Sequence, residues 1–449
     1  MKIIQIIPGS GGSFYCGNCL RDDKYYHAIK KLGHDVLKVP MYLPLFSRNS
    51  ENNSHSPVFY GAVSIYLKQT YPAFRHAPEW VDGLLNSGPM LRQAAKMAGS
   101  TRARGLEEMT ISMLMGEEGE QAAELEKMTR WLEQHFRPDV IHISNALLLG
   151  LAGTLKSRLG APVVCSLQDE DVWVDVMSPA NRNRVWQLMG EKAEGVDSFI
   201  SVSDYFSGLI RNRMSINDKK LHTIHLGVNP GEYNYRDPAG KKRSVGFLSR
   251  MNHDNGFDIL VDAFILLKQD PANDDVVLYL SGGSTNDDSS FLKEQRSKIA
   301  GAGLGHDVVF LENFDHGKRH IFFDLVSVLS VPVRRGEAFG IYLAEAMASG
   351  IPVVQPALGA FPEIIGATGG GIAYGHNDPA NLAEALEKVI SNPALMSEMG
   401  ARARKGVEEK FNIQTQAEKL VEVYNRVFLN NGKSANTQAD EGFIPMPGI

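Results

Sequence analysis

A chain of 449 residues is too long for one ordinary hydrophobic core, so its length predicts two domains. Its hydrophobic content of 43% and charged content of 22% are typical of soluble globular proteins, and its net charge of −6 argues against general nucleic-acid binding. No apolar run approaches the ~18 residues of a transmembrane helix, although contact with a membrane surface stays open. Three cysteines do not form the disulfide framework of a small secreted protein, so we expect a cytoplasmic protein.

The chain opens with a predicted strand at residues 2–7, whose apolar run is too short for a signal peptide. A glycine-rich turn at residues 8–13, which includes Gly11 and Gly12, precedes a helix and a second strand at residues 35–39. This opening is typical of nucleotide-binding sheets. The turn lacks the G-x-G-x-x-G spacing, however, so an ordinary strand-to-helix connection is an equal alternative.

Two cysteines, Cys16 and Cys19, lie where the first helix is expected to begin. A C-x-x-C at a helix N-terminus can hold a reactive thiolate or a disulfide. No second Cys/His pair stands at a spacing suited to a metal site, and Cys165 lies in an apolar strand. We therefore favour a structural role over redox chemistry, and redox chemistry over metal binding.

Residues from about 41 to 130 interrupt the strand-and-helix pattern and predict a largely helical insertion that faces the cleft or a partner. Several basic residues of this insertion form either a solvated face or a surface for an acceptor or a lipid. They are Arg92, Lys96, Arg102 and Arg104.

Strands and helices alternate again at residues 139–143, 163–167 and 198–202, which predicts a parallel sheet covered on both faces. Ligands bind at the carboxyl ends of such strands. Gln168 and the acids of residues 169–171 lie at such an end. The D-x-D spacing allows a metal, but solvent-facing or capping acids are the commoner outcome.

Residues 226–230 predict a connection between domains, after which the pattern restarts with a strand at residues 244–248. We place the first domain at 1–228, the second at 229–412, a final helix at 413–429 and a disordered tail at 430–449.

The most informative stretch is a strand–loop–helix–strand unit at residues 331–355. Glu337 lies in the loop, and Glu345 lies roughly one and a half turns into a helix that opens near Gly340. Free backbone N–H groups and the helix dipole favour an anion at such an N-terminus. The amides of Gly340 and Ile341 are therefore expected to bind a phosphate, and the two glutamates to accept hydroxyl groups.

The spacing Glu337-x7-Glu345, in the setting GEAFGIYLAEAMASGIPVV, resembles glycosyltransferase family 4, the retaining "group 1" transferases. Weaker signals support the resemblance: GHDV at residues 33–36, DVIH at 139–142, SVS at 201–203, LGV at 226–228 and Glu363 after a proline. The resemblance implies an α/β fold of the GT-B type, with two doubly wound Rossmann-like parallel-sheet domains facing a cleft.

The resemblance also implies roles for individual residues at the phosphates of the donor. Arg250 would reach the pyrophosphate, and Gly340 and Ile341, next to Phe339, would donate their amides to it. With these groups in place, no metal and no cofactor is required. An ordinary surface ion pair is the alternative for Arg250.

On the sugar side, Glu337 would face the donor sugar and stabilise positive charge near its anomeric carbon. Glu345 would bind the ribose, while Gly11 and Gly12 of the first, acceptor-side domain would let the backbone approach the donor. The last helix would cross back onto that domain. The alternatives are a solvated loop acid for Glu337 and a pair within the helix for Glu345.

Two residues depart from the family pattern. Asn255 stands where a lysine usually binds the phosphates, and Gln168 stands where a histidine usually contacts the sugar. The loss of one charge-assisted contact costs about 1.5–3 kcal/mol. Lys24 or Arg21 is a candidate to supply the missing positive charge.

The sequence therefore predicts a hexosyltransferase-like, retaining enzyme that moves a sugar from a nucleotide-sugar donor to a carbohydrate or lipid-linked acceptor or a small molecule. Two alternatives stay open. One is a sugar-phosphate or disaccharide synthase of the same fold, and the other is a nucleotide-sugar-binding protein with little turnover.

Overall fold

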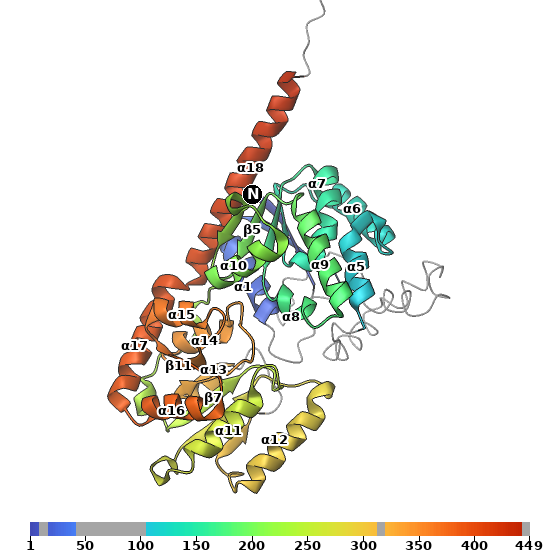
Figure 1. The fold of residues 1–449 in the computed structure, drawn as a ribbon. Coiled ribbons are helices and arrows are strands. Elements are labelled where there is room, and N and C mark those ends of the chain that lie inside the picture. The colour runs from blue at the N-terminus through green and yellow to red at the C-terminus, as the bar shows by residue number, and fades with distance from the viewer. Residues whose placement is uncertain (9–16, 42–104, 312–318, 442–449) are drawn as a thin grey trace, which may run out of the picture.

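The computed structural model of the protein describes residues 1–8, 17–41, 105–311 and 319–441, with Cys19 and residues 433–441 by their backbone alone (Figure 1). The expectations for Gly11, Gly12 and Cys16, and for the four basic residues of the insertion, therefore lie outside the described residues.

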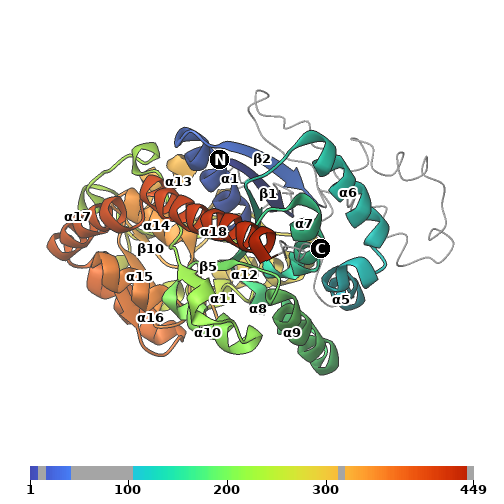
Figure 2. The same ribbon diagram turned by 90° about the horizontal axis from the view of Figure 1, so that it is seen from above.

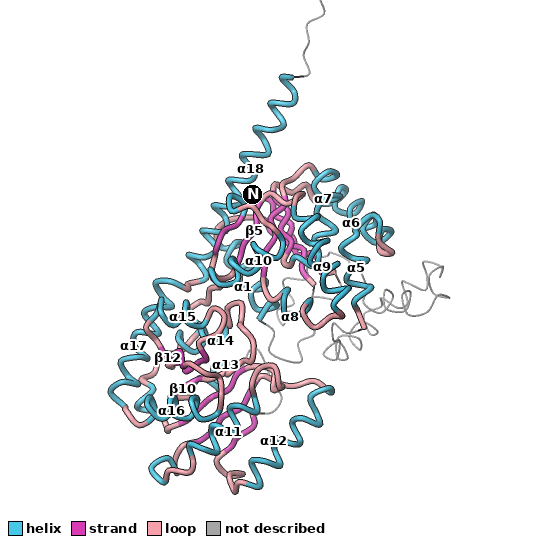
Figure 3. The backbone as a smooth tube through the Cα atoms, viewed as in Figure 1, coloured by secondary structure: helices cyan, strands magenta, loops and turns pink. Residues whose placement is uncertain are grey.

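The described chain forms two lobes, each built on its own six-stranded parallel sheet with helices packed around it (Figure 3). In the first lobe the strand order is β2-β1-β3-β4-β5-β6. The strands are β1 (Lys2–Ile7), β2 (Asp35–Pro40), β3 (Val140–Ile143), β4 (Val163–Leu167), β5 (Ser198–Ser201) and β6 (Leu221–Thr223). The helices are α1 (Gly17–Lys31), α5 (Glu107–Met115), α6 (Ala122–His135), α7 (Ala152–Leu159), α8 (Glu170–Val174), α9 (Pro179–Ala193) and α10 (Asp204–Met214).

The second lobe has the strand order β12-β11-β10-β7-β8-β9. Its strands are β7 (Ser244–Leu248), β8 (Val277–Ser281), β9 (Val308–Phe310), β10 (Val328–Leu329), β11 (Val353–Pro356) and β12 (Gly371–Tyr374). Its helices are α11 (Phe257–Leu267), α12 (Ser289–Gly301), α13 (Arg319–Leu325), α14 (Ile341–Ala348), α15 (Phe361–Thr368), α16 (Pro379–Ile390) and α17 (Pro393–Lys410). The prediction of two doubly wound parallel sheets is confirmed.

The sequence prediction omitted two edge strands, β6 and β12. Each is only three or four residues long, and each is partly exposed rather than a continuous buried run. Fully buried strands such as β4 and β7 gave a clear signal, and their predicted limits agree with the structure.

The chain passes between the lobes at two points that lie side by side. The N–H of Val228 donates to the carbonyl of Phe411 at 2.9 Å, and the N–H of Ile413 donates to the carbonyl of Val228 at 2.9 Å. A Cβ atom on Gly227 would lie 2.5 Å from Cα of Ile413, so only glycine allows this approach. The predicted connection at 226–230 therefore runs beside a second connection, at residues 411–413, where the chain returns to the first lobe.

The long C-terminal helix α18 (Ile413–Glu441) runs from α17 along the first lobe, where it packs against α1 and β3 (Figure 2). Tyr424, fully buried, contacts Nδ1 of His142 through its hydroxyl, and Nε2 of His142 lies 2.8 Å from Oγ of Ser166. Burial lowers the pKa of His142 to about 3, so this link is neutral.

The sequence prediction ended this helix at Leu429 and made residues 430–449 a disordered tail, whereas the structure continues the helix to Glu441. No proline interrupts residues 430–441, and extending an existing helix costs far less than starting one. Along the described parts of the chain, no helix combines the length and the apolar character that crossing a membrane requires.

Candidate functional site

The N-terminus of α14 is built from buried residues and a glycine in an unusual conformation. Gly340 has a φ of +79°, and a Cβ atom there would lie 3.0 Å from the ring of Phe361. Ile341 then begins the helix, close to where the sequence predicts its start. All eight residues of α14 are buried, which fixes the direction of its free N-terminal amides.

Two helix N-termini, one from each lobe, meet at this point. A Cβ atom on Gly17, the first residue of α1, would lie 3.7 Å from Nε2 of Gln168 and 3.7 Å from Cγ2 of Ile341. Gln168 follows the carboxyl end of β4, as predicted. The junction therefore combines a buried amide with the positive ends of two helix dipoles, which favours an anionic ligand.

The loop that carries Glu337 is fixed by the first lobe. The hydroxyl of Ser203 donates to the carbonyl of Ala338 at 2.6 Å and accepts the N–H of Phe206 at 3.1 Å, which caps α10. On its other side, the N–H of Ala338 hydrogen-bonds to the carboxylate of Asp169. Glu337 is therefore placed by contacts between the lobes.

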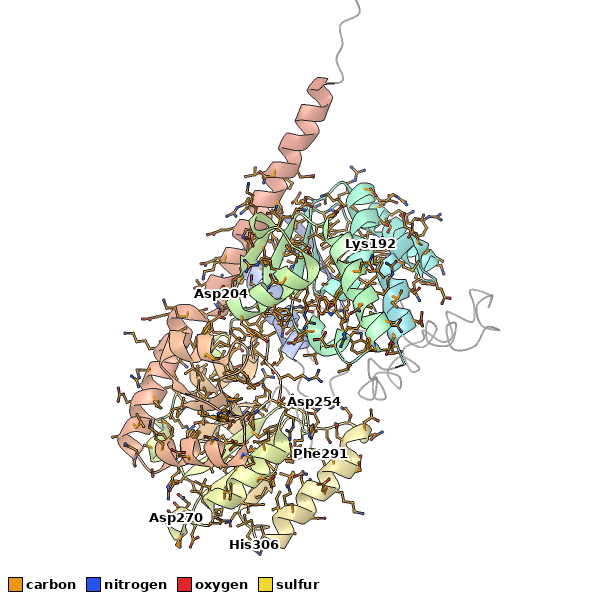
Figure 4. The ribbon with its side chains drawn as sticks, in the orientation of Figure 1. Lys192, Asp204, Asp254, Asp270, Phe291 and His306 are labelled. Atoms are coloured by element: carbon orange, nitrogen blue, oxygen red, sulfur yellow. The ribbon has the colours of Figure 1, made fainter. Side chains whose placement is uncertain are left out.

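Glu363, on α15, makes a second contact between the lobes. Its carboxylate accepts the N–H groups of Asp204 and Tyr205 at the N-terminus of α10 and lies 2.6 Å from Nε2 of His225. Figure 4 shows Asp204 where the lobes meet. Burial opposes ionisation, but these hydrogen bonds hold the pKa of Glu363 below its usual range. Glu363 thus acts as an ionised cap that joins the second lobe to α10.

Glu337 faces other acids at this junction. Burial, together with the charges of Asp169 and Asp171, raises the pKa of Glu337 to about 8, although a hydrogen bond from Tyr342 opposes the shift. Burial and the Asp171 charge also raise the pKa of Asp169, to about 6. Glu337 therefore holds its proton more strongly than an ordinary glutamate does.

Glu345 is fully buried inside the second lobe. Its Oε1 atom accepts the hydroxyl of Tyr233 at 2.6 Å and Nε of Arg319 at 3.1 Å. These partners come from the connection between the lobes and from α13, not from α14 itself. The structure thus pairs Glu345 with residues outside its own helix, while the role at a ribose stays a prediction.

Arg250 is engaged with an acid of its own lobe. Its Nε and Nη2 atoms bind the two carboxylate oxygens of Asp288 at 2.8 and 3.1 Å, and Nη2 also donates to Oγ1 of Thr285 at 2.6 Å. Although burial opposes the effect, this pairing lowers the pKa of Asp288. The structure thus contains an ion pair of Arg250, but a largely buried one and not the surface pair of the alternative, and the role at the pyrophosphate stays a prediction.

Asn255 stabilises the loop that carries Arg250. Its side-chain amide donates to Oγ of Ser249 at 3.0 Å and to the carbonyl of Arg250 at 2.9 Å. The following residue, Gly256, has a φ of +68°, and a Cβ atom there would lie 1.8 Å from the carbonyl of Pro332. Asn255 thus has a structural task in this loop, besides the donor contact that the sequence predicts.

Arg21 is the cation beside Gln168. Its Nη1 atom donates to Oε1 of Gln168 at 3.2 Å, and both residues are buried. Lys24 instead lies 3.4 Å from the hydroxyl of Tyr233 and 3.7 Å from the carboxylate of Glu232. Of the two cations named from the sequence, Arg21 is therefore the one in contact with Gln168.

Nothing in the sequence assigned a separate role to Asp169 or to Ser203, although both belong to segments that carry predicted features. Asp169 has a φ of +62°, a value that non-glycine residues rarely adopt, and no sequence signal indicates it. Among the residues that the structure describes, His, Cys, Asp and Glu side chains form no group of three suited to a metal ion.

The two sheets and the contacts at the ends of their strands define a two-lobed GT-B fold. Solved structures share it over nearly the whole chain. Sucrose-phosphate synthase from Thermosynechococcus elongatus has a TM-score of 0.70 and 18% identity, and covers 96% of this chain and 100% of its own. HepE from Anabaena, in complex with UDP, has a TM-score of 0.66 and 18% identity, and covers 95% of this chain and 100% of its own.

Residues 89–227 match the glycosyl transferase 4-like domain, and residues 235–406 match the glycosyl transferases group 1 family. The lipopolysaccharide core biosynthesis mannosyltransferase LpsB of Rhizobium meliloti is 29% identical over 192 residues, or 42% of this chain. The chain spans 52% of the length of that relative. The chain belongs to the group 1 glycosyltransferases with a 4-like N-terminal domain, and the predicted family is confirmed.

Proposed function

We propose that the protein is a retaining glycosyltransferase that moves a sugar, a hexose in the first instance, from a nucleotide-sugar donor to a carbohydrate or lipid-linked acceptor. The observation that carries the proposal is the junction of the α1 and α14 N-termini with Gln168 and Glu337 beside it. The names of two similar proteins support it, because HepE is described with UDP and LpsB as a mannosyltransferase. Retention is proposed from the resemblance of the Glu337-x7-Glu345 segment to a retaining family.

The junction suits the charges that develop during sugar transfer. As the nucleoside diphosphate departs, negative charge grows on its phosphates, where the amides of Gly340 and Ile341 can stabilise it. The sugar becomes oxocarbenium-like, and the acids Glu337 and Asp169 lie where they can stabilise positive charge. Because Arg250 is paired with Asp288, the donor pyrophosphate would have to replace that carboxylate.

We expect the phosphates to be held without a metal, because the helix amides and Arg250 supply the required positive charge. Arg319 is a further cation on the second lobe. It pairs with Glu345, and the side chain of that acid is predicted to bind the ribose.

A second candidate function is a nucleotide-sugar-binding protein with weak turnover. The observation that favours it is the structural use of Asn255 and Arg250, both of which are engaged within their own lobe. A lysine at position 255 would have offered the phosphates a second cation. Such a binding protein would gain thermal stability when the donor is added, but it would not transfer the sugar.

One series of measurements separates these functions. Thermal shift with UDP-, GDP- and ADP-sugars identifies the donor, and the best donor is then incubated with acceptor extracts and with sugar phosphates. Transfer with the donor's anomeric configuration, read by NMR, supports the retaining enzyme, and transfer to a sugar phosphate identifies a synthase. Stabilisation without turnover supports the binding protein, and no stabilisation by any nucleotide-sugar contradicts both.

A further inference from the structure

The amide of Gln168 has a defined orientation at the junction of the lobes. Gln168 is 3% exposed, and Nη1 of Arg21 lies 3.2 Å from its Oε1 atom. An arginine side chain carries only hydrogen-bond donors, so the atom that faces Arg21 must be the carbonyl oxygen. Nε2, with its two N–H groups, therefore points the other way, toward Gly17.

Arg21 itself is held firmly enough to impose this orientation. It is 4% exposed. Its Nε and Nη2 atoms lie 3.0 and 2.9 Å from Oδ1 of Asp22, and Nη2 also donates to the carbonyl of Ser144. The guanidinium group is planar, so these contacts fix the direction of the two Nη1 N–H groups, one of which binds Gln168. A lysine could not make this set of contacts with a single ammonium group.

The orientation matters because acids surround the amide. A hydrogen bond from Gln168 supports the ionised form of Asp169, and Asp169 in turn is the acid that acts most strongly on Glu337. A flipped amide would turn its carbonyl oxygen toward Asp169, and the junction would then lose its side-chain donor next to that acid. A sugar hydroxyl needs an acceptor for its proton and a donor for its oxygen.

We propose that Arg21 is a positioning residue, which holds Gln168 so that its amide donates a hydrogen bond to a hydroxyl oxygen of the transferred sugar. The inference rests on the proposed function, because it assigns the ligand of this amide within the transfer reaction. Arg21 touches no substrate in this scheme. It acts through Gln168, on the sugar side of the site, and leaves the phosphate contacts of α14 unchanged.

A double-mutant cycle with Arg21→Lys and Gln168→Met tests the proposal through kcat and KM for the nucleotide-sugar. Each single variant should lower kcat about 10- to 100-fold, the effect of losing one such hydrogen bond, and change KM less than about threefold. The double variant should be no slower than the slower single variant, because both remove the same contact. Effects that multiply, or an Arg21→Lys variant with the wild-type kcat, would overturn the proposal.

Two further variants keep the test decisive if Arg21→Lys folds poorly. Gln168→Glu keeps an acceptor for Arg21 but removes the donor, so it should fold and transfer slowly, and a wild-type rate would contradict the proposal. Arg158→Lys is the matched control, because Arg158 pairs with Glu126 and Glu133 within the same lobe, and its kcat should not change. If the wild-type protein neither binds nor transfers a sugar, the proposed function itself fails; if it transfers and the cycle is multiplicative, only the role of Arg21 fails.

Discussion

The hydroxyl of Ser203 in the first lobe donates a 2.6 Å hydrogen bond to the carbonyl of Ala338 in the second. Ala338 lies between Glu337 and the start of α14, so the N-cap residue of a helix in one lobe helps to determine where the Glu337 loop of the other lobe lies. The same hydroxyl caps α10. The position of Glu337 is therefore coupled to the packing of the lobes, and residues with no substrate contact should affect transfer.

Ser203→Ala should lower both stability and transfer. The loss of the helix cap costs about 1 kcal/mol, and the loss of the hydrogen bond to Ala338 loosens the Glu337 loop. Thermal unfolding should show a decrease in Tm, and kcat should fall more than affinity for the nucleotide. Ser157→Ala is the control, since that hydroxyl donates to the carbonyl of Thr154 within its own helix, and its kcat should not change. Full activity of Ser203→Ala would show that the loop is positioned without it.

The stability of the protein should depend on the titration of Glu337. Its pKa is about 8 in the folded protein against 4.5 for the ordinary side chain. Between these values the unfolded chain releases a proton that the folded protein retains, so the free energy of unfolding falls as the pH rises. Glu337→Gln removes this effect. Its Tm should equal that of the wild type near pH 4 and exceed it increasingly toward pH 9, by about 2–4 °C for each kcal/mol of stability that the wild type loses.

Glu133→Gln is the control for that experiment. Hydrogen bonds from Arg158 lower the pKa of Glu133, so its titration has the opposite sign and its removal should give no gain in Tm at high pH. A Tm difference for Glu337→Gln that does not vary with pH would mean that the carboxyl group is ionised throughout the neutral range.

Glu337→Ala and Glu345→Ala should affect different properties: the first should lower kcat, and the second should lower stability and nucleotide affinity. Glu337→Ala should lower kcat by about 100-fold or more while nucleotide affinity, measured by calorimetry with the nucleoside diphosphate, stays within about threefold. Glu345→Ala leaves Tyr233 and Arg319 without their buried acceptor, so about 3–5 kcal/mol of stability should be lost along with nucleotide affinity. An unchanged rate for Glu337→Ala would remove it from the site.

The sequence predicted local features of the site well and distant pairings poorly. The spacing of Glu337 and Glu345 and the start of α14 depend on residues within one short segment, so they could be derived. The partner of Arg250 is 38 residues away, at Asp288, and the partner of Gln168 is 147 residues away, at Arg21. Such partners depend on how the elements pack in three dimensions, and no spacing rule reports that.

The backbone of Asp169 offers a test that separates stability from activity. Its φ of +62° is unfavourable for a residue with a Cβ atom, by about 1 kcal/mol relative to glycine. Asp169→Gly should therefore leave the protein as stable as the wild type or more so, and yet reduce transfer, because the carboxylate beside Gln168 and Ala338 is lost. Strain of this kind persists mainly where function requires the side chain.

Ser215→Gly is the matched control for Asp169→Gly. Ser215, with a φ of +53°, ends α10 in the same left-handed region, at the opposite end of that helix from Ser203. Both variants should be at least as stable as the wild type in thermal unfolding, while only Asp169→Gly should lose kcat. If both variants kept full activity, Asp169 would be a strained turn residue and not part of the transfer site; if both lost stability, the left-handed backbone would not be the source of strain.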